Sequence, residues 1–427
     1  MAKARSTTKD GGKSRPNPLL ASWRTPFKAP PFDRIEPRHF KPAFNEALRA
    51  HRQEIPDIAG KAAKPTSANT IVALEKSGAL LNKVADVFFN LASADTNEAL
   101  QAVEREMAPK LAKHQSALLL NRRLFLRFAD LYERRAELGL DAEALRLLER
   151  TYKGFERAGA KLDATARRRI AEINTELATL GTAFTQNVLA DEQAWHMILD
   201  GEQDLAGLPE TFRAAAAQAA TELGQPGKYA ITLARSSVEP FLQFSARRDL
   251  REEAWKAWIK RGENGGKTDN RKIIVRMMAL RVELARLLGF DTYAAYVLED
   301  TMAKTPAEVR KLLDKVWPAA LRRARAERDA LEKRARDEGE NFKIAAWDWR
   351  YYAEKERKAR YDLDEAEVRS YLALENVLEA AFDTAGKLFG IVFEERSDVS
   401  VYHPDVRAWE VKTKGGDNVV LFYGDYY

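Results

Sequence analysis

Apolar side chains recur at steps of three and four residues along most of this 427-residue chain, and this spacing limits the possible folds. Such steps place the side chains on one face of an α-helix. Three stripes of this kind stand out: Leu80, Leu81, Val84, Val87, Phe88 and Leu91; Ile170, Ile173, Leu177, Leu180, Phe184 and Val188; Val309, Leu312, Leu313, Val316, Trp317 and Ala320. The sequence therefore predicts a mostly helical protein from about Pro42 onward.

The third stripe also carries a helix start signal. Thr305 can act as an N-cap, Pro306 suits the first helical position, and Glu308 can close a capping box. These residues predict that a helix begins at Pro306.

The pattern changes near the end of the chain. Segments 400–402, 407–412 and 419–423 are rich in aromatic and β-branched residues and predict strands, with a turn at 414–418 between the last two. Because an aromatic strand with an open edge invites pairing with another chain, a stop at Tyr427 favours a truncated domain.

These patterns predict an order of segments. Residues 1–16 form a disordered basic tail, 17–260 a helical N-terminal region, and 261–427 a helical region that ends in a small β-sheet. Within 17–35, prolines and aromatics alternate, which predicts an extended strap laid over the body.

Charge gives little support for a nucleic-acid partner. The net charge is +6, and the first fifteen residues alone carry +4 of it. A phosphate-binding groove needs basic residues clustered on one folded face. We therefore expect no nucleic-acid partner, and a solvated tail explains the excess charge.

The composition also restricts the chemistry and the location. None of the 427 residues is a cysteine, which excludes disulfides, thiolate metal ligands and a cysteine nucleophile. No stretch of about eighteen apolar residues occurs, and the basic tail lacks the apolar core of a secretory signal. We expect a cytoplasmic protein with no membrane partner.

The five histidines do not suggest a metal site. They are His39, His51, His114, His196 and His403, and none is spaced for the helical zinc motif H-E-x-x-H. Glu192 and His196 are four residues apart, but a surface contact within a helix explains that spacing. We predict no metal ligand and no catalytic residue in this chain.

Two polar or aromatic clusters remain as candidates. Residues 403–407 gather an imidazole, a carboxylate and a guanidinium, and they form either a polar cleft wall or a turn with a local His–Asp contact. Residues 347–352 (WDWRYY) suggest base stacking, but the lack of basic clustering favours packing at a helix junction.

Many segments, in order, resemble one family, the thimet-oligopeptidase-like zinc metallopeptidases, and within it the dipeptidyl carboxypeptidase and oligopeptidase A branch. These segments are 32–35 (FDRI), 40–44 (FKPAF), 65–78 (PTSANTIVALEKSG), 186–189 (QNVL), 247–252 (RRDLRE), 300–309 (DTMAKTPAEV), 347–355 (WDWRYYAEK), 402–411 (YHPDVRAWEV) and 421–427 (LFYGDYY).

The resemblance implies a mostly helical, channel-forming fold in which residues 17–260 form one channel wall and 261–427 begin a catalytic domain. It also implies one zinc, held in the family by H-E-x-x-H and a downstream glutamate. Since that motif is missing here, we expect the N-terminal part of an oligopeptide-cleaving peptidase that binds no zinc and is inactive alone.

The resemblance places the last strands beside the family's active site. His403, Arg407 and Tyr423 lie in this region and are the candidate residues for binding short peptides. A separate chain that carries the catalytic half is a second expected partner. The alternative is a non-catalytic peptide-binding or interaction protein derived from the family.

Overall fold

The computed structural model describes residues 16–363 and 365–426, which form two compact units. The first unit combines the chain up to residue 179 with residues 381–427, and the second holds residues 180–380. The predicted boundary at 260/261 lies inside the second unit. Except for Pro16, the predicted tail lies outside the described residues.

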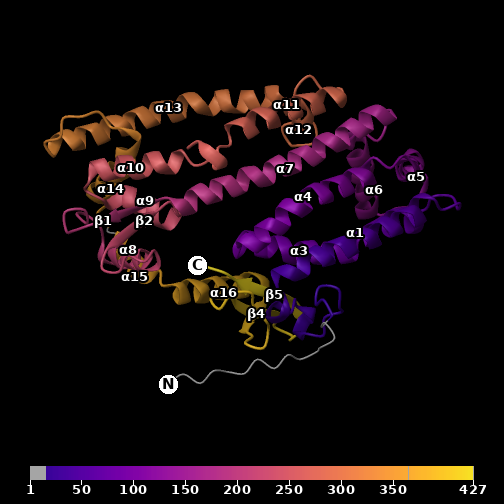
Figure 1. Ribbon diagram of the computed structural model, residues 1–427, viewed down its shortest axis with the longest axis horizontal. Coiled ribbons are helices and arrows are strands. Elements are labelled where there is room, and N and C mark those ends of the chain that lie inside the picture. Colours follow the sequence, from indigo (N-terminus) through magenta and orange to yellow (C-terminus); the bar gives the residue numbers. More distant parts are fainter. Residues whose placement is uncertain (1–15, 364, 427) are drawn as a thin grey trace. The chain divides into compact units, whose positions relative to one another are not determined.

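The prediction of a mostly helical fold with a small C-terminal sheet is confirmed (Figure 1). The α-helices are α1 (Pro37–Ala59), α2 (Ala73–Lys76), α3 (Ala79–Ala94), α4 (Glu98–Leu119), α5 (Arg122–Glu133), α6 (Ala142–Ala158), α7 (Ala164–Ala194), α8 (Glu210–Glu222), α9 (Arg235–Phe244), α10 (Arg248–Ile259), α11 (Arg271–Leu287), α12 (Tyr293–Leu298), α13 (Pro306–Asp337), α14 (Ala346–Tyr361), α15 (Glu365–Tyr371) and α16 (Leu374–Phe389). Short 3-10 or π turns are η1 (Pro26–Lys28), η2 (Phe32–Arg34), η3 (Ser67–Val72), η4 (Arg135–Glu137) and η5 (Gly266–Thr268).

Helix α1 organises the core of the first unit. Its buried residues, among them Phe40, Phe44 and Leu48, recur at three- and four-residue steps and therefore share one face. Phe88 of α3 packs edge-to-face on both Phe40 and Phe44, with ring centroids 5.1 and 5.3 Å apart. Burial of these rings makes α1, α3 and α4 one packed layer.

The second unit has its own core and a buried ionic cluster. Strands β1 (His196–Leu199) and β2 (Tyr229–Thr232) pair antiparallel, and α8, α9 and α10 share a core with them. Glu192 bonds Arg261 instead of His196, which lies exposed on β1.

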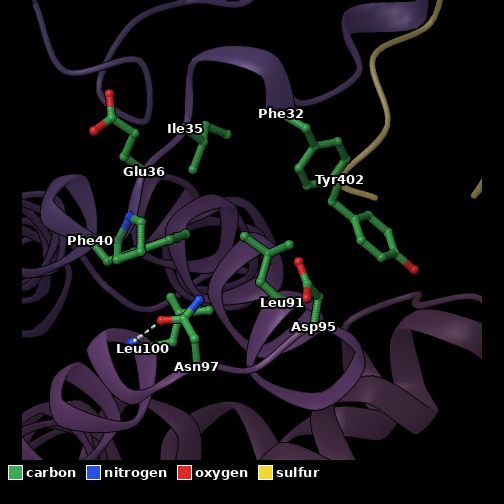
Figure 2. A pocket seen from close by; sticks show the side chains of 10 residues that line it. Phe32, Ile35, Glu36, Phe40, Leu91, Asp95, Asn97, Leu100 and Tyr402 are labelled. Atoms are coloured by element: carbon green, nitrogen blue, oxygen red, sulfur yellow. Dashed lines mark hydrogen bonds between the residues drawn. The ribbon is translucent and has the colours of Figure 1, made fainter. Parts of the chain in front are cut away.

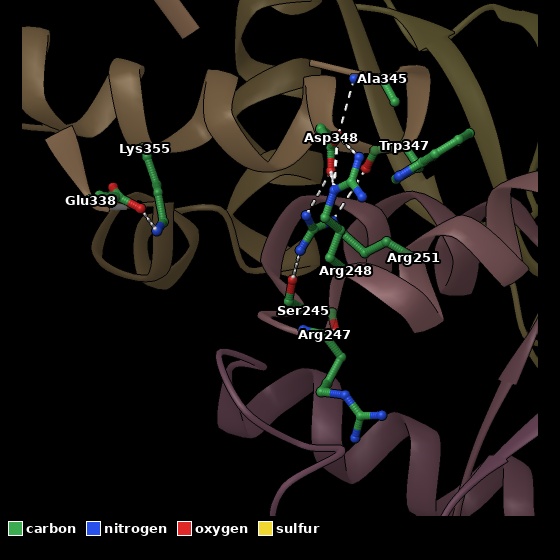
Figure 3. A network of polar contacts seen from close by, with 9 residues as sticks. All are labelled: Ser245, Arg247, Arg248, Arg251, Glu338, Ala345, Trp347, Asp348 and Lys355. Carbon is green, nitrogen blue, oxygen red and sulfur yellow. Dashed lines mark hydrogen bonds and ion pairs between the residues drawn. The ribbon is translucent and has the colours of Figure 1, made fainter. Parts of the chain in front are cut away.

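The ionic cluster of the second unit fastens α10 to α14 (Figure 3). Asp348, which is fully buried, accepts hydrogen bonds from Arg248 and Arg251 at 2.9–3.2 Å. Its carboxylate also accepts the Ala345 N–H at 3.1 Å and so caps α14. The prediction that residues 347–352 pack at a helix junction therefore agrees with the structure, in which Trp347 also contacts Trp255 of α10.

The third apolar stripe forms the predicted helix but is not buried. Helix α13 begins at Pro306, and the Thr305 hydroxyl accepts the Glu308 N–H, as predicted. Yet Leu312 and Trp317 are 63% and 64% exposed. Spacing reports which residues share a helix face, and it does not report what covers that face.

A three-stranded antiparallel sheet, here called the C-terminal sheet, completes the first unit. It consists of β3 (Ile391–Glu395), β4 (Arg407–Thr413) and β5 (Asn418–Gly424), in that order. The predicted strand at 400–402 is wrong, and β3 was missed. Residues 400–402 form a loop in which the Ser400 carbonyl accepts the Tyr423 hydroxyl at 3.3 Å, and the Ser400 hydroxyl accepts the Asp33 N–H at 2.9 Å.

The strap, residues 17–35, lies beside the C-terminal sheet in Figure 1. It is not simply extended, because η1 and η2 interrupt it. No helix among the described residues is long and apolar enough to cross a membrane.

Candidate functional site

The C-terminal sheet carries all the predicted binding residues on or beside it, and its two faces meet different partners. Trp409 pairs with Phe422 across β4 and β5, and both pack with Phe393 against Phe382 of α16. Because side chains alternate along a strand, the neighbouring residues point to the opposite face, toward the strap. Each face is therefore covered by a different part of the chain.

Arg407 lies on the α16 face and is held by a carboxylate. Its Nε and Nη2 donate to the two Glu395 carboxylate oxygens at 2.8 and 2.7 Å, and the guanidinium stands 4.9 Å from the Trp409 ring. The Arg407 guanidinium lowers the pKa of the Glu395 carboxyl, chiefly through the hydrogen bonds that it donates. The guanidinium fits bidentate carboxylate recognition but already holds such a partner.

Tyr423 lies on the strap face. It pairs with Ala408 and meets the edge of Phe32 with ring centroids 6.2 Å apart. The hydroxyl donates to the Ser400 carbonyl at 3.3 Å, and burial raises the pKa of Tyr423 to about 12. Tyr423 is therefore neutral at physiological pH and works as an apolar wall with one polar end.

His403 sits in the exposed loop before β4. Its Nδ1 accepts the Asp405 N–H at 3.3 Å and lies 3.5 Å from the Asp405 carboxylate. Of the two readings of this segment, the turn with a local His–Asp contact describes the geometry. The structure does not bring His403, Arg407 and Tyr423 together on one surface.

Tyr402 is the site residue that the sequence analysis did not single out. Its ring lies edge-on to Phe32 at 5.4 Å, and its hydroxyl donates to Asp425 at 2.7 Å. Burial, the Asp425 hydrogen bond and the nearby Asp95 carboxylate raise the pKa of Tyr402 to about 12. The only available signal was its position at the start of the YHPDVRAWEV segment.

Tyr402 and Phe32 form one wall of a cavity of about 110 Å³ (Figure 2). The cavity lies between the strap, the ends of α3 and α4, and the loop before β4. Its lining consists of Phe32, Ile35, Glu36, Pro37, Phe40, Leu91, Asp95, Asn97, Leu100 and Tyr402. Apolar rings and two carboxylates in one small cavity suit a side chain that is apolar and, where charged, positive.

The histidines do not offer zinc a set of ligands. His51 and His114 are the only imidazoles that meet among the described residues, and they hydrogen-bond each other at 3.0 Å. No group of three or more His, Asp or Glu side chains that could hold a metal occurs within 16–363 and 365–426. Zinc needs three or four converging ligands, so the residues present do not fit it.

Comparison with known proteins gives one consistent result. Residues 241–427 match Peptidase family M3. The chain is 40% identical over 412 residues to the dipeptidyl carboxypeptidase of Escherichia coli (strain K12). This match covers 96% of this chain and 60% of that protein. It is 30% identical over 415 residues to oligopeptidase A of the same organism, and this match covers 96% of this chain and 60% of oligopeptidase A.

A plant protein shows the same coverage. The chain is 30% identical over 420 residues to the probable cytosolic oligopeptidase A of Arabidopsis thaliana, with 96% of this chain and 59% of that protein covered. The chain thus spans about three fifths of the length of the curated relatives it matches.

Proposed function

This chain belongs to peptidase family M3, in the branch of dipeptidyl carboxypeptidase and oligopeptidase A, and on that premise we propose that it serves the hydrolysis of short peptides. The observation that carries the proposal is the 40% identity to a dipeptidyl carboxypeptidase along 96% of this chain. The chain's part in that hydrolysis is to bind and position the peptide, and its place of work is the cytoplasm.

Family members are zinc peptidases, and the metal supplies activation of water for attack on the peptide bond. The described residues of this chain do not fit that metal, and H-E-x-x-H occurs nowhere in its 427 residues. In our proposal the zinc ligands therefore lie in a segment that corresponds to the two fifths of the relatives that this chain does not match. That segment belongs either to the same polypeptide or to a separate one. These 427 residues alone would not cleave peptides.

The C-terminal sheet supports a role in peptide binding. Among the described residues no strand pairs with the outer edge of β5, so its free backbone groups can accept an extended peptide as a further strand. Arg407 and Tyr423 face opposite sides, so they would contact different residues of that peptide. Arg407 suits a carboxylate, and His403 suits a polar group beside the loop.

A non-catalytic peptide-binding protein is the second candidate. It is favoured by one observation: the open strand edge is present while the metal ligands are not. In that case the whole protein would bind short peptides without cleaving them.

The experiment that tests the proposal uses purified chain with unlabelled six- to ten-residue peptides. Calorimetry measures peptide and zinc binding, and mass spectrometry measures dipeptide release with and without added zinc. We expect peptide binding, no stoichiometric zinc and no cleavage. Cleavage by this chain alone would overturn the division of roles, and absence of peptide binding would overturn the binding role.

A second experiment supplies the zinc ligands that this chain lacks. A polypeptide that carries the region of E. coli dipeptidyl carboxypeptidase beyond the matched three fifths is added to the chain. Zinc-dependent dipeptide release by the mixture, but by neither part alone, would support the peptidase. Peptide binding that is never converted to cleavage in the mixture would favour the non-catalytic candidate.

A further inference from the structure

Two histidines lie buried against each other in the core of the first unit, away from the candidate site. His51 of α1 is 8% exposed and His114 of α4 is 5% exposed. Their ring centroids are 4.8 Å apart, and His114 Nε2 lies 3.0 Å from His51 Nδ1. The pair joins helices that are far apart in sequence but packed in one layer.

The hydrogen bonds fix the position of every proton in this pair. The Ser77 hydroxyl donates to the Leu74 carbonyl at 2.7 Å, so its oxygen must accept the bond from His51 Nε2 at 3.1 Å. His51 Nδ1 is then bare and accepts the N–H of His114 Nε2. His114 Nδ1 is bare as well, and it has no partner among the described protein atoms.

Neither histidine of this hydrogen-bonded chain offers a favourable site for an added proton. On His51 Nδ1 it would face the N–H of His114, and on His114 Nδ1 it would point to no acceptor of the protein. The neutral pair, by contrast, satisfies each of its donors. The geometry therefore tolerates only the uncharged form.

The charged groups around the two histidines do not offset the cost of protonating them. On α1, Glu54 favours a positive His51, but Arg52 disfavours a positive His114. The Glu54 carboxylate also accepts the Gly78 N–H at 2.7 Å, so the link between α2 and α3 already uses it. On α4, Lys110 is paired with Glu106, and the α2–α3 link offers only the uncharged Ser77 and Gly78.

We propose that the His114–His51–Ser77 chain is an acid-sensitive latch, which holds α1, α4 and the α2–α3 link together when neutral and lets them separate when it is protonated. Nothing in the proposed peptide-binding role requires it. It makes the stability of the helix packing in the first unit depend on pH.

The direction of the effect follows from the linkage between protonation and unfolding. Burial, the neighbouring His51 and Arg52 lower the pKa of His114 from 6.5 to about 4, and burial lowers that of His51. A histidine with a lowered pKa stabilises the fold fully above 6.5, and this stabilisation is lost as the pH falls toward the folded-state value. From His114 alone, the equilibrium constant for opening should rise roughly twentyfold between pH 7 and pH 5.

Hydrogen exchange on the full chain tests the latch, with rates corrected for the intrinsic effect of pH on exchange. We expect the amides of α1 and α4 to lose roughly twentyfold protection between pH 7 and pH 5. In His114→Gln, whose amide N–H can still reach His51 but cannot gain a proton in this range, the loss should be several times smaller, because only the contribution of His51 remains. His196→Gln, at an exposed histidine on β1, is the matched control and should behave like the wild type.

Two outcomes would overturn the latch: unchanged protection in the wild type down to pH 5, or an equal loss in His114→Gln. A further measurement needs no substitution. In ¹³C-labelled wild-type protein, NMR follows the five imidazoles, and two of them should gain protons only as α1 and α4 lose protection. Protonation of all five near pH 6.5 without that loss would contradict the proposal.

Discussion

Arg407 and Tyr423 lie on paired strands only one register position apart, yet their side chains point to opposite faces of the C-terminal sheet. Arg407 is held by Glu395 beside Trp409, while Tyr423 packs on Phe32 of the strap. A peptide could meet both residues only as an extended strand whose side chains alternate in the same way. This separation makes the role of each residue testable by itself.

Replacement of Glu395 should remove one carboxylate that competes with a peptide for Arg407. Both side chains are partly exposed, so Glu395→Gln should change the free energy of unfolding by less than about 1 kcal/mol. If Arg407 binds peptides, Glu395→Gln should tighten peptide binding roughly two- to fivefold, because a competing carboxylate is gone. Arg407→Ala, measured by the same calorimetry, should weaken it. Equal affinity in both variants would remove Arg407 from the site.

Asp348→Asn should destabilise the second unit severely. The substitution leaves the guanidinium groups of Arg248 and Arg251 without their buried anion, at a cost of about 3–5 kcal/mol. Urea unfolding followed by tryptophan fluorescence reports on this unit, because six of the eight tryptophans lie within it.

The matched control for that substitution is Asp337→Asn in the same unit. Asp337 and its partner Lys333 are both more than half exposed, so the change should cost less than about 1 kcal/mol. Similar losses in the two variants would show that burial does not decide the strength of the Asp348 contacts.

Gly78→Ala should destabilise the first unit more than Gly139→Ala. Both glycines have positive φ, which costs an alanine about 1–2 kcal/mol. At Gly78 the new methyl would also lie within 2.7 Å of the His51 ring, whereas at Gly139 it would meet open space. We expect the difference to exceed about 1 kcal/mol in urea unfolding followed by circular dichroism. Equal losses would mean that the His51 ring moves aside freely.

Tyr402 and Tyr423 should ionise at a higher pH than an ordinary tyrosine. The pKa of each is about 12, compared with 10 for an ordinary tyrosine. A raised pKa means that the folded chain keeps its protons longer, so this contribution to stability is full below pH 10 and is lost as the pH rises toward 12. Tyrosinate absorbance measures the effect, and the final step should shrink by one tyrosine in Tyr402→Phe and in Tyr423→Phe. A final step of unchanged size in both variants would contradict the assignment.

Helices could be predicted from the sequence because their signals are local. The spacing of Val84, Val87 and Phe88 gave both the helix and its buried face, and Thr305 with Pro306 gave the start of α13. Burial of a stripe depends on distant segments, so the exposure of Leu312 and Trp317 on α13 could not be seen in the spacing.

The site was harder to predict than the fold. Arg407 and Tyr423 were placed correctly on strands, but which face each one takes depends on the register between β4 and β5, and a bulge shifts that register between Val411 and Lys412. Tyr402 gains its environment from Phe32 and Asp95, hundreds of residues earlier in the chain. No local pattern around Tyr402 carries that information.

The pairing of the strap with the C-terminal sheet sets an order for the events of biosynthesis. Ala29 and Phe32 pack on residues of the sheet that follow position 398, so the ribosome must add all of the second unit before the strap meets its partner. At ordinary rates of translation, roughly 200 residues take about 10–40 s. During that interval residues 180–380 can reach their final structure, while the strap still waits for the C-terminal sheet.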